Sequence, residues 1–180
     1  MEWPVDLSSE VILDPRRKKK WVDEKKRVCY MIYPRSLGLT SGEDGKFWGW
    51  EYFQESSGDL FEVAKLKEIC WFAIKGRLNM SKLSRKVDYE AVFVVKLSEW
   101  AQGWDSPVKL KLTLPDGKTH ERRAALLLEP RGKWLELVVG NFKIHKNEKN
   151  LGDLKCSVSS KTPYWKHGLT LKGLMIRPKN

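Results

Sequence analysis

The stretch VKLKLTLPDGK (residues 108–118) decides the fold class of this chain. Valine or leucine occupies every second position of residues 108–114 and lysine or threonine fills the positions between them, a pattern typical of a strand with one buried and one solvated face. Residues 115–118 supply turn chemistry, because proline presets one backbone angle and Asp and Gly tolerate the others. The stretch therefore predicts a β-hairpin whose second strand begins near Thr119.

The rest of the chain repeats this pattern of short β-prone runs separated by turns. The runs cover residues 11–14, 21–22, 28–33, 47–52, 69–78, 89–97, 134–139 and 169–177. Only residues 59–67 and 81–86 have a composition that allows a helical turn. Many short strands without alternating helices predict an all-β protein, an antiparallel β-sandwich of the jelly-roll type, and not a βαβ protein.

Length and charge limit the organisation of the chain and its partners. With 180 residues the chain is about one domain long, so we expect an extension over residues 1–10 and a single domain over residues 11–180. The formal net charge of +11 favours anionic partners, although a basic surface needs no specific site. The N-terminal residues lack a signal-peptide pattern, and no apolar run approaches the roughly 20 residues that cross a bilayer, so we expect neither secretion nor a membrane.

A run of basic residues follows the first predicted strand. It consists of Arg16, Arg17, Lys18, Lys19 and Lys20. Lysine and arginine at the tip of a hairpin are readily solvated, so a solvated turn within residues 16–27 explains the basic residues without any function. The alternative is a patch that binds nucleic acid or directs nuclear import.

The residues that usually carry catalysis or bind metal are scattered. The histidines are His120, His145 and His167, and the cysteines are Cys29, Cys70 and Cys156. Neither set has the spacing of a zinc site, and no nucleophile elbow or phosphate-binding glycine loop is present. We therefore expect no enzymatic activity, no metal and no cofactor. The three cysteines predict free thiols, and an odd number of them is compatible with a homodimer.

Aromatic content is the most unusual feature of the composition, with nine tryptophans in the chain. A tryptophan ring offers a flat apolar face that stacks on the C–H groups of a sugar. Three tryptophans are expected to fill the core: Trp50, Trp71 and Trp134. Three others fall in expected loops: Trp100, Trp104 and Trp165. Trp48 and Trp165 are the candidates for a sugar-binding platform.

Several motifs resemble the phloem protein 2 family of plants, which includes the Nictaba-type lectins. The resemblance covers about residues 11–180. It rests on residues 29–31 (CYM), 35–37 (RSL), 47–50 (FWGW), 63–64 (VA), 92–97 (VFVVKL), 134–136 (WLE), 165–168 (WKHG) and 172–178 (KGLMIRP). No F-box segment is expected before the domain. The resemblance implies a jelly-roll β-sandwich without enzymatic activity, located in the cytoplasm, nucleus or phloem sieve elements.

The resemblance also implies a ligand and a site. The ligand is an N-acetylglucosamine oligomer or an N-glycan core, free or on a glycoprotein. The family site has two tryptophans, which fall on Ser41 and Trp48 here, and two acidic residues, which fall on Asp153 and Ser160. Only Trp48 and Asp153 match the residue types of the family site, whereas Ser41 and Ser160 do not. Residues around Trp165 are expected to close the site. The alternative function is a phloem carrier that binds RNA or protein and has weak or lost sugar binding.

Overall fold

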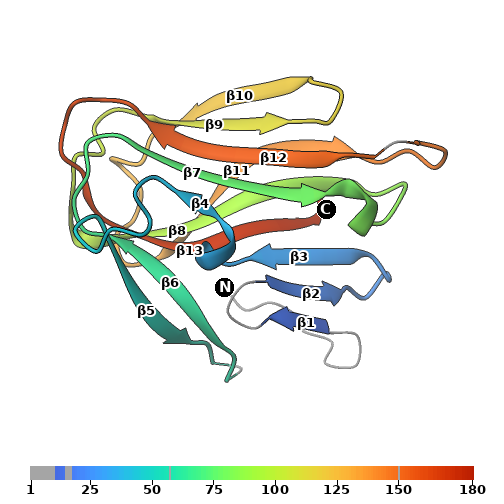
Figure 1. Cartoon of the computed structure of the whole chain (residues 1–180), viewed down its shortest axis with the longest axis horizontal. Helices are drawn as coiled ribbons and strands as arrows, with labels where there is room; N and C mark the ends of the chain where they lie inside the picture. The colour runs from blue at the N-terminus through green and yellow to red at the C-terminus, as the bar shows by residue number, and fades with distance from the viewer. Residues whose placement is uncertain (1–10, 15–17, 57, 150) are drawn as a thin grey trace.

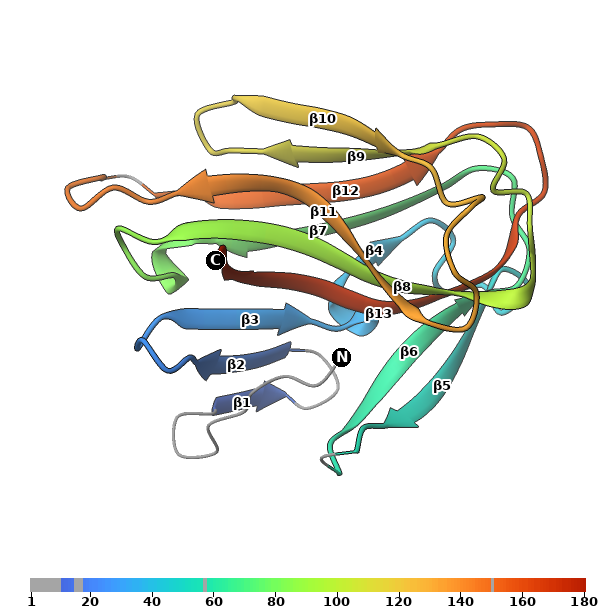
Figure 2. The same ribbon diagram turned by 180° about the vertical axis from the view of Figure 1, so that it is seen from behind.

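The computed structural model of the chain contains two antiparallel β-sheets packed face to face, shown from opposite sides in Figures 1 and 2. It describes residues 11–14, 18–56, 58–149 and 151–180. The predicted antiparallel β-sandwich is confirmed. Within these residues the helical structure is limited to two 3-10 turns, η1 (Pro34–Ser36) and η2 (Met80–Lys82).

The larger sheet has eight strands and the smaller sheet has five. The larger sheet contains β1 (Val11–Asp14), β2 (Lys18–Val22), β3 (Val28–Ile32), β5 (Trp48–Gln54), β6 (Leu60–Leu66), β8 (Asp88–Gln102), β11 (Trp134–Lys143) and β13 (His167–Pro178). The smaller sheet contains β4 (Gly38–Leu39), β7 (Phe72–Asn79), β9 (Val108–Thr113), β10 (Thr119–Ala124) and β12 (Asp153–Ser160). Strands β8 and β13 form the centre of the larger sheet, where β13 pairs with β3, β6 and β8.

The predicted hairpin is present as β9 and β10, with Thr113 opposite Thr119. The Leu114 amide donates to the Lys118 carbonyl at 2.9 Å, and Gly117 closes the turn at φ +91°. Val108, like the two leucines that alternate with lysine along β9, is buried. The alternation of apolar and polar residues therefore predicted the buried face of β9 correctly.

Two segments differ from the prediction. Residues 59–67 were expected to allow a helical turn, but β6 occupies this region because its apolar residues pack on both faces of the larger sheet. Tertiary packing outweighs local propensity here. Strand β12 was not predicted, although its buried residues Leu154, Cys156 and Val158 alternate with outward lysine and serine. The turn expected near residue 81 exists as η2, where the Asn79 side chain accepts from the Ser81 amide.

The turn expected within residues 16–27 is formed by residues 23–27, where Asp23 pairs with Arg27. The basic run itself is not part of this turn. Lys18, Lys19 and Lys20 belong to strand β2, and Lys19 is only 7% exposed, with its Nζ 2.9 Å from an Asp59 carboxylate oxygen. Arg16 and Arg17 lie outside the described residues.

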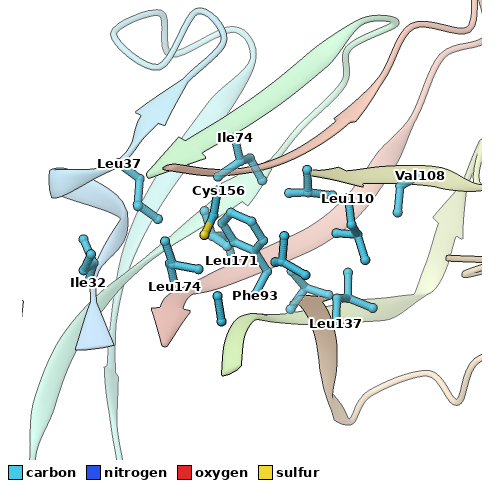
Figure 3. Close-up of a cluster of buried hydrophobic side chains, with 14 of the residues drawn as sticks. Ile32, Leu37, Ile74, Phe93, Val108, Leu110, Leu137, Cys156, Leu171 and Leu174 are labelled. Carbon is cyan, nitrogen blue, oxygen red and sulfur yellow. The ribbon is translucent and has the colours of Figure 1, made fainter. Parts of the chain in front are cut away.

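The core between the sheets is a continuous apolar cluster to which both sheets contribute (Figure 3). A second cluster covers the outer face of the larger sheet, where Phe53 contacts Phe61 and Trp134. Trp134 therefore packs in this second cluster and not between the sheets. Trp50 is half-buried beneath the Arg35 guanidinium, which lies 3.6 Å from its ring centroid.

The buried thiols give a first prediction. Cys29 and Cys156 are each 3% exposed, and burial raises the pKa of both thiols from about 9 to about 12, while Cys70 is half-buried. A thiol reagent at neutral pH should therefore label Cys70 in the folded protein and the other two only after unfolding. Because the unfolded thiols lose protons first, the free energy of unfolding should fall as pH rises from 9 to 12. Rapid native labelling of all three would contradict this arrangement.

Candidate functional site

Three large aromatic side chains are exposed on two neighbouring loops at one end of the sandwich. Trp71 is 59% exposed on the loop between β6 and β7, and Tyr164 and Trp165 are 65% and 59% exposed on the loop between β12 and β13. The loops are joined by an isolated bridge, in which Ile69 and Lys166 exchange backbone hydrogen bonds of 3.0 and 2.8 Å. Figures 1 and 2 show these connections at the same end of the molecule. The three aromatic residues are named the aromatic rim here.

A buried lysine holds these loops together. The Lys166 ammonium donates to the Cys70 carbonyl at 2.6 Å on one loop and to the Tyr164 carbonyl at 2.9 Å on the other. A longer bond of 3.4 Å reaches the Thr162 carbonyl. The residue is only 1% exposed, and burial lowers the pKa of its ammonium. Since charged donors form strong hydrogen bonds, this side chain adds to the backbone bridge in holding the spacing of the rim.

The loop between β8 and β9 packs against the loop that carries Trp165. A Cβ atom at Gly103 would lie 2.1 Å from the Trp165 carbonyl oxygen, and Gly103 has φ +90°, so glycine is required for this close approach. The next residue, Trp104, is 1% exposed, and its indole N–H donates to the His167 carbonyl at 3.0 Å. Its ring meets the Phe72 ring edge-on. Trp104 is therefore a structural residue and not a loop platform.

Two hydroxyl groups beside the rim have no partner among the described residues. They are the buried Ser160 Oγ, at the end of β12, and the buried Thr162 Oγ1, in the loop that follows. Buried polar groups in proteins are almost always hydrogen-bonded, so such groups mark a place for water or for a ligand hydroxyl. Ser160 lies opposite Phe72, the residue that follows Trp71.

Trp48, the predicted stacking platform, is buried. It is 1% exposed in the core, and its indole N–H donates to the Thr40 carbonyl at 2.8 Å. A sugar has no access to either face of this ring, so the predicted role is wrong. Trp48 is the first residue of β5, and its side chain lies on the face of the strand that packs in the core.

The remaining predicted residues divide between the two ends of the sandwich. Ser41 is exposed at φ +57° near the rim, because Thr40 is fastened to Ala73 through its amide and hydroxyl. Ser160 and Trp165 lie at the same end. Asp153 lies at the opposite end of β12, about 23 Å away for seven residues of extended chain. It therefore does not share a site with the others.

The aromatic rim contains two residues that sequence reasoning missed. Trp71 was expected in the core, yet Phe72, Ile74 and Leu78 face inward, so the period of two places Trp71 outward. This alternation can be read from the sequence, but the apolar neighbours Cys70 and Phe72 favoured a buried position for Trp71. Tyr164 follows a proline in a polar connection, next to the predicted Trp165, and this placement favours exposure.

Two features are absent from the described residues, a cluster of metal-ligating side chains and a membrane-spanning helix. No group of three or more His, Cys, Asp or Glu side chains there is arranged to hold a metal ion. The same part of the chain contains no helix of the length and apolarity that spanning a bilayer requires. What the rim offers is stacking surface and hydroxyl groups, which suit a neutral polar ligand with apolar faces.

Comparisons with known proteins agree with this description. A likeness to an exo-β-agarase structure (TM-score 0.53, 14% identity, 83% of this chain and 25% of that one) shows the fold. The chain is 40% identical over 177 residues to the phloem protein 2-like protein A1 of Arabidopsis thaliana, covering 96% of this chain and 71% of that protein. It is 39% identical to a lectin of Luffa acutangula, covering 96% and 82%. The family model for phloem protein 2 matches residues 27–178. The chain therefore belongs to the phloem protein 2 family.

Proposed function

We propose that the chain is a non-catalytic lectin whose sugar site is the aromatic rim. The observation that carries the proposal is the exposure of three aromatic side chains on two loops that one buried lysine holds together. Family membership and the relative named as a lectin support a carbohydrate ligand. The proposed ligand class is N-acetylglucosamine oligomers or N-glycan cores. The proposed site of action is the phloem, which the name of the Arabidopsis relative supports.

The chemistry of the rim suits such a ligand. Trp71 and Trp165 each offer an apolar ring face, which stacks on the axial C–H groups of a pyranose. Ser41 is exposed at the same end and supplies a hydroxyl group that can bond sugar hydroxyls or acetamido groups. Because the loops are fixed before binding, little conformational entropy is lost when the ligand arrives.

Trp71→Ala and Trp165→Ala are each expected to weaken binding of a chito-oligosaccharide about ten- to a hundredfold. Stacking on an aromatic ring contributes roughly 1–3 kcal/mol when measured with nucleic-acid bases, and a sugar should lose a comparable amount. Isothermal titration calorimetry measures the affinity, and thermal melting of each variant should be nearly unchanged because both side chains are largely exposed.

Tyr52→Ala is the matched control, because Tyr52 is 48% exposed on β5, outside the loops of the rim. It should keep full affinity for the chito-oligosaccharide. The rim would be excluded as the sugar site if both tryptophan variants bound as tightly as the unaltered protein, or if Tyr52→Ala weakened binding as much as they do.

A further inference from the structure

The outer face of the smaller sheet carries a cluster of positive charge. Its strands lie side by side in the order β10, β9, β12, β7, β4, as Figure 1 shows. Positions that alternate with the buried residues point outward there. Six of these positions are basic: Lys75, Arg77, Lys109, Lys111, Arg123 and Lys155. This set is named the basic face.

The strand register brings these side chains into rows. Lys75 and Lys111 lie on either side of Ser157, on three neighbouring strands. In the next row Lys155 lies between Arg77 and Thr113. Adjacent strands are about 4.8 Å apart and alternate residues of a strand about 7 Å, so the four cationic groups of these rows surround a small area of the sheet.

The positive charges are only partly compensated. Glu121 lies 3.4 Å from the Lys109 ammonium and 3.8 Å from that of Lys111, and Asp153 lies 4.0 Å from Arg77. Lys75 and Lys155 have no carboxylate within 4.0 Å among the described residues. The positive field extends beyond the sheet, since Lys82 and Arg77 add to the effect of burial in lowering the pKa of Lys18.

A pocket of about 410 Å³ lies within the basic face, and its volume is in the range of small-ligand sites. The four basic residues of the two rows line it. Hydroxyl groups line it as well, from Ser36, Thr113 and Ser157. The pocket therefore combines uncompensated ammonium groups, which bind anions, with hydroxyl groups, which bind sugar hydroxyls.

We propose that this pocket is a second binding site, for an oligosaccharide that carries carboxylate or sulfate groups. The other outward positions of the two rows are Ser157 and Thr113, which carry hydroxyl groups, and the next row contains the small residues Ala73 and Ser159 beside Lys109. Proteins that bind single-stranded RNA combine a basic groove with aromatic rings on which the bases stack, and the basic face offers no such rings in these rows. A duplex is too wide for a pocket of this size. An anionic saccharide needs only charges and hydroxyls, and both are present.

The test uses polygalacturonate and dextran sulfate as ligands, with methyl-esterified polygalacturonate and dextran as their neutral counterparts. At least one anionic polymer should bind, its neutral counterpart should not, and affinity should fall steeply with added salt. The double variant Lys75→Gln and Lys155→Gln should bind that polymer roughly 10- to 100-fold more weakly, since each side chain provides charged hydrogen bonds.

The matched control removes two charges elsewhere. Lys25 and Lys26 are exposed in the turn between β2 and β3, and their double change to Gln should leave affinity for the acidic polymer nearly unchanged. The Lys75 and Lys155 variant should keep the melting temperature and the affinity for chito-oligosaccharides, whereas Trp71→Ala should keep the affinity for the acidic polymer. These readouts separate the second site from the aromatic rim.

Three results would overturn the proposal. One is the absence of binding to both anionic polymers at low salt. Another is equal binding by the Lys75 and Lys155 variant and the unaltered protein. The third is an affinity for single-stranded RNA that exceeds the affinity for both acidic polymers and depends on the same two lysines, because the basic face would then serve nucleic acid.

Discussion

Replacing Trp48 with alanine is expected to lower the free energy of unfolding by about 3–5 kcal/mol. The indole ring is 1% exposed in the core between the sheets, so its removal leaves a cavity there. The change also deprives the Thr40 carbonyl of its donor at 2.8 Å, at the point where the chain enters the loop before β5. Urea denaturation measures the effect as a lower midpoint with an unchanged slope.

Trp48→Phe is the control for this prediction. It keeps an aromatic ring in the core but loses the indole N–H, so it should cost less, about 1–3 kcal/mol. Sugar binding, measured well below the melting temperature, should survive in the folded fraction of both variants. If Trp48→Ala kept its stability and lost its sugar affinity, Trp48 would be a binding residue and the rim would not be the site.

The fold was largely predictable because strict alternation is a strong signal. Residues 108–114 contain apolar side chains at every second position and residues 115–118 form a turn that only a few residue types allow, so both the strand and its partner were identified. Strand β12 was missed although Leu154, Cys156 and Val158 alternate with polar residues in the same way. Its neighbours, β7 and β9, are distant in sequence, so no adjacent turn indicated its pairing.

The site was less predictable, because exposure depends on how loops pack. Trp48 and Trp71 are both tryptophans in apolar surroundings, yet one is 1% exposed and the other 59%. The difference arises from which face of its strand or loop each side chain occupies. Trp165 was predicted correctly to be exposed, since it lies in a polar connection. The position of Lys166 as a link between two loops depends on contacts across 96 residues of sequence, which a single sequence does not reveal.

The basic face was also hidden in the sequence. The longest contiguous basic run is at residues 16–20, and it leads into a strand in which Lys19 is buried against Asp59. The cationic residues of the pocket alternate with apolar ones along three strands, so in sequence they read as the ordinary solvated side of a sheet. Only the register of β7, β12 and β9 brings them together.

Lys166→Met is expected to loosen the aromatic rim and to lower the free energy of unfolding by about 2–4 kcal/mol. Methionine keeps the length of the side chain but provides no donor for the carbonyls of Cys70 and Tyr164, and hydrogen bonds from charged groups contribute about 1.5–3 kcal/mol each. The relief of the burial cost of the ammonium offsets part of this loss. Affinity for a chito-oligosaccharide should also fall, because the two loops lose the side-chain link between them and keep only the backbone bridge between Ile69 and residue 166.

The pH dependence of this effect gives a readout that a general packing defect would not produce. Burial lowers the pKa of the Lys166 ammonium below its ordinary value of 10.5, so between these two values the unfolded chain binds more protons than the folded one. The contribution of Lys166 to stability should therefore rise with pH just below 10.5, and this rise should be absent from Lys166→Met. Subtracting the two curves removes the opposite effect of Cys29 and Cys156, which both proteins share.

Lys161→Met, at an exposed lysine of the same loop, should match the unaltered protein in stability and in sugar affinity. Equal stability and equal sugar affinity of Lys166→Met and Lys161→Met would show that the rim is held by contacts other than this ammonium.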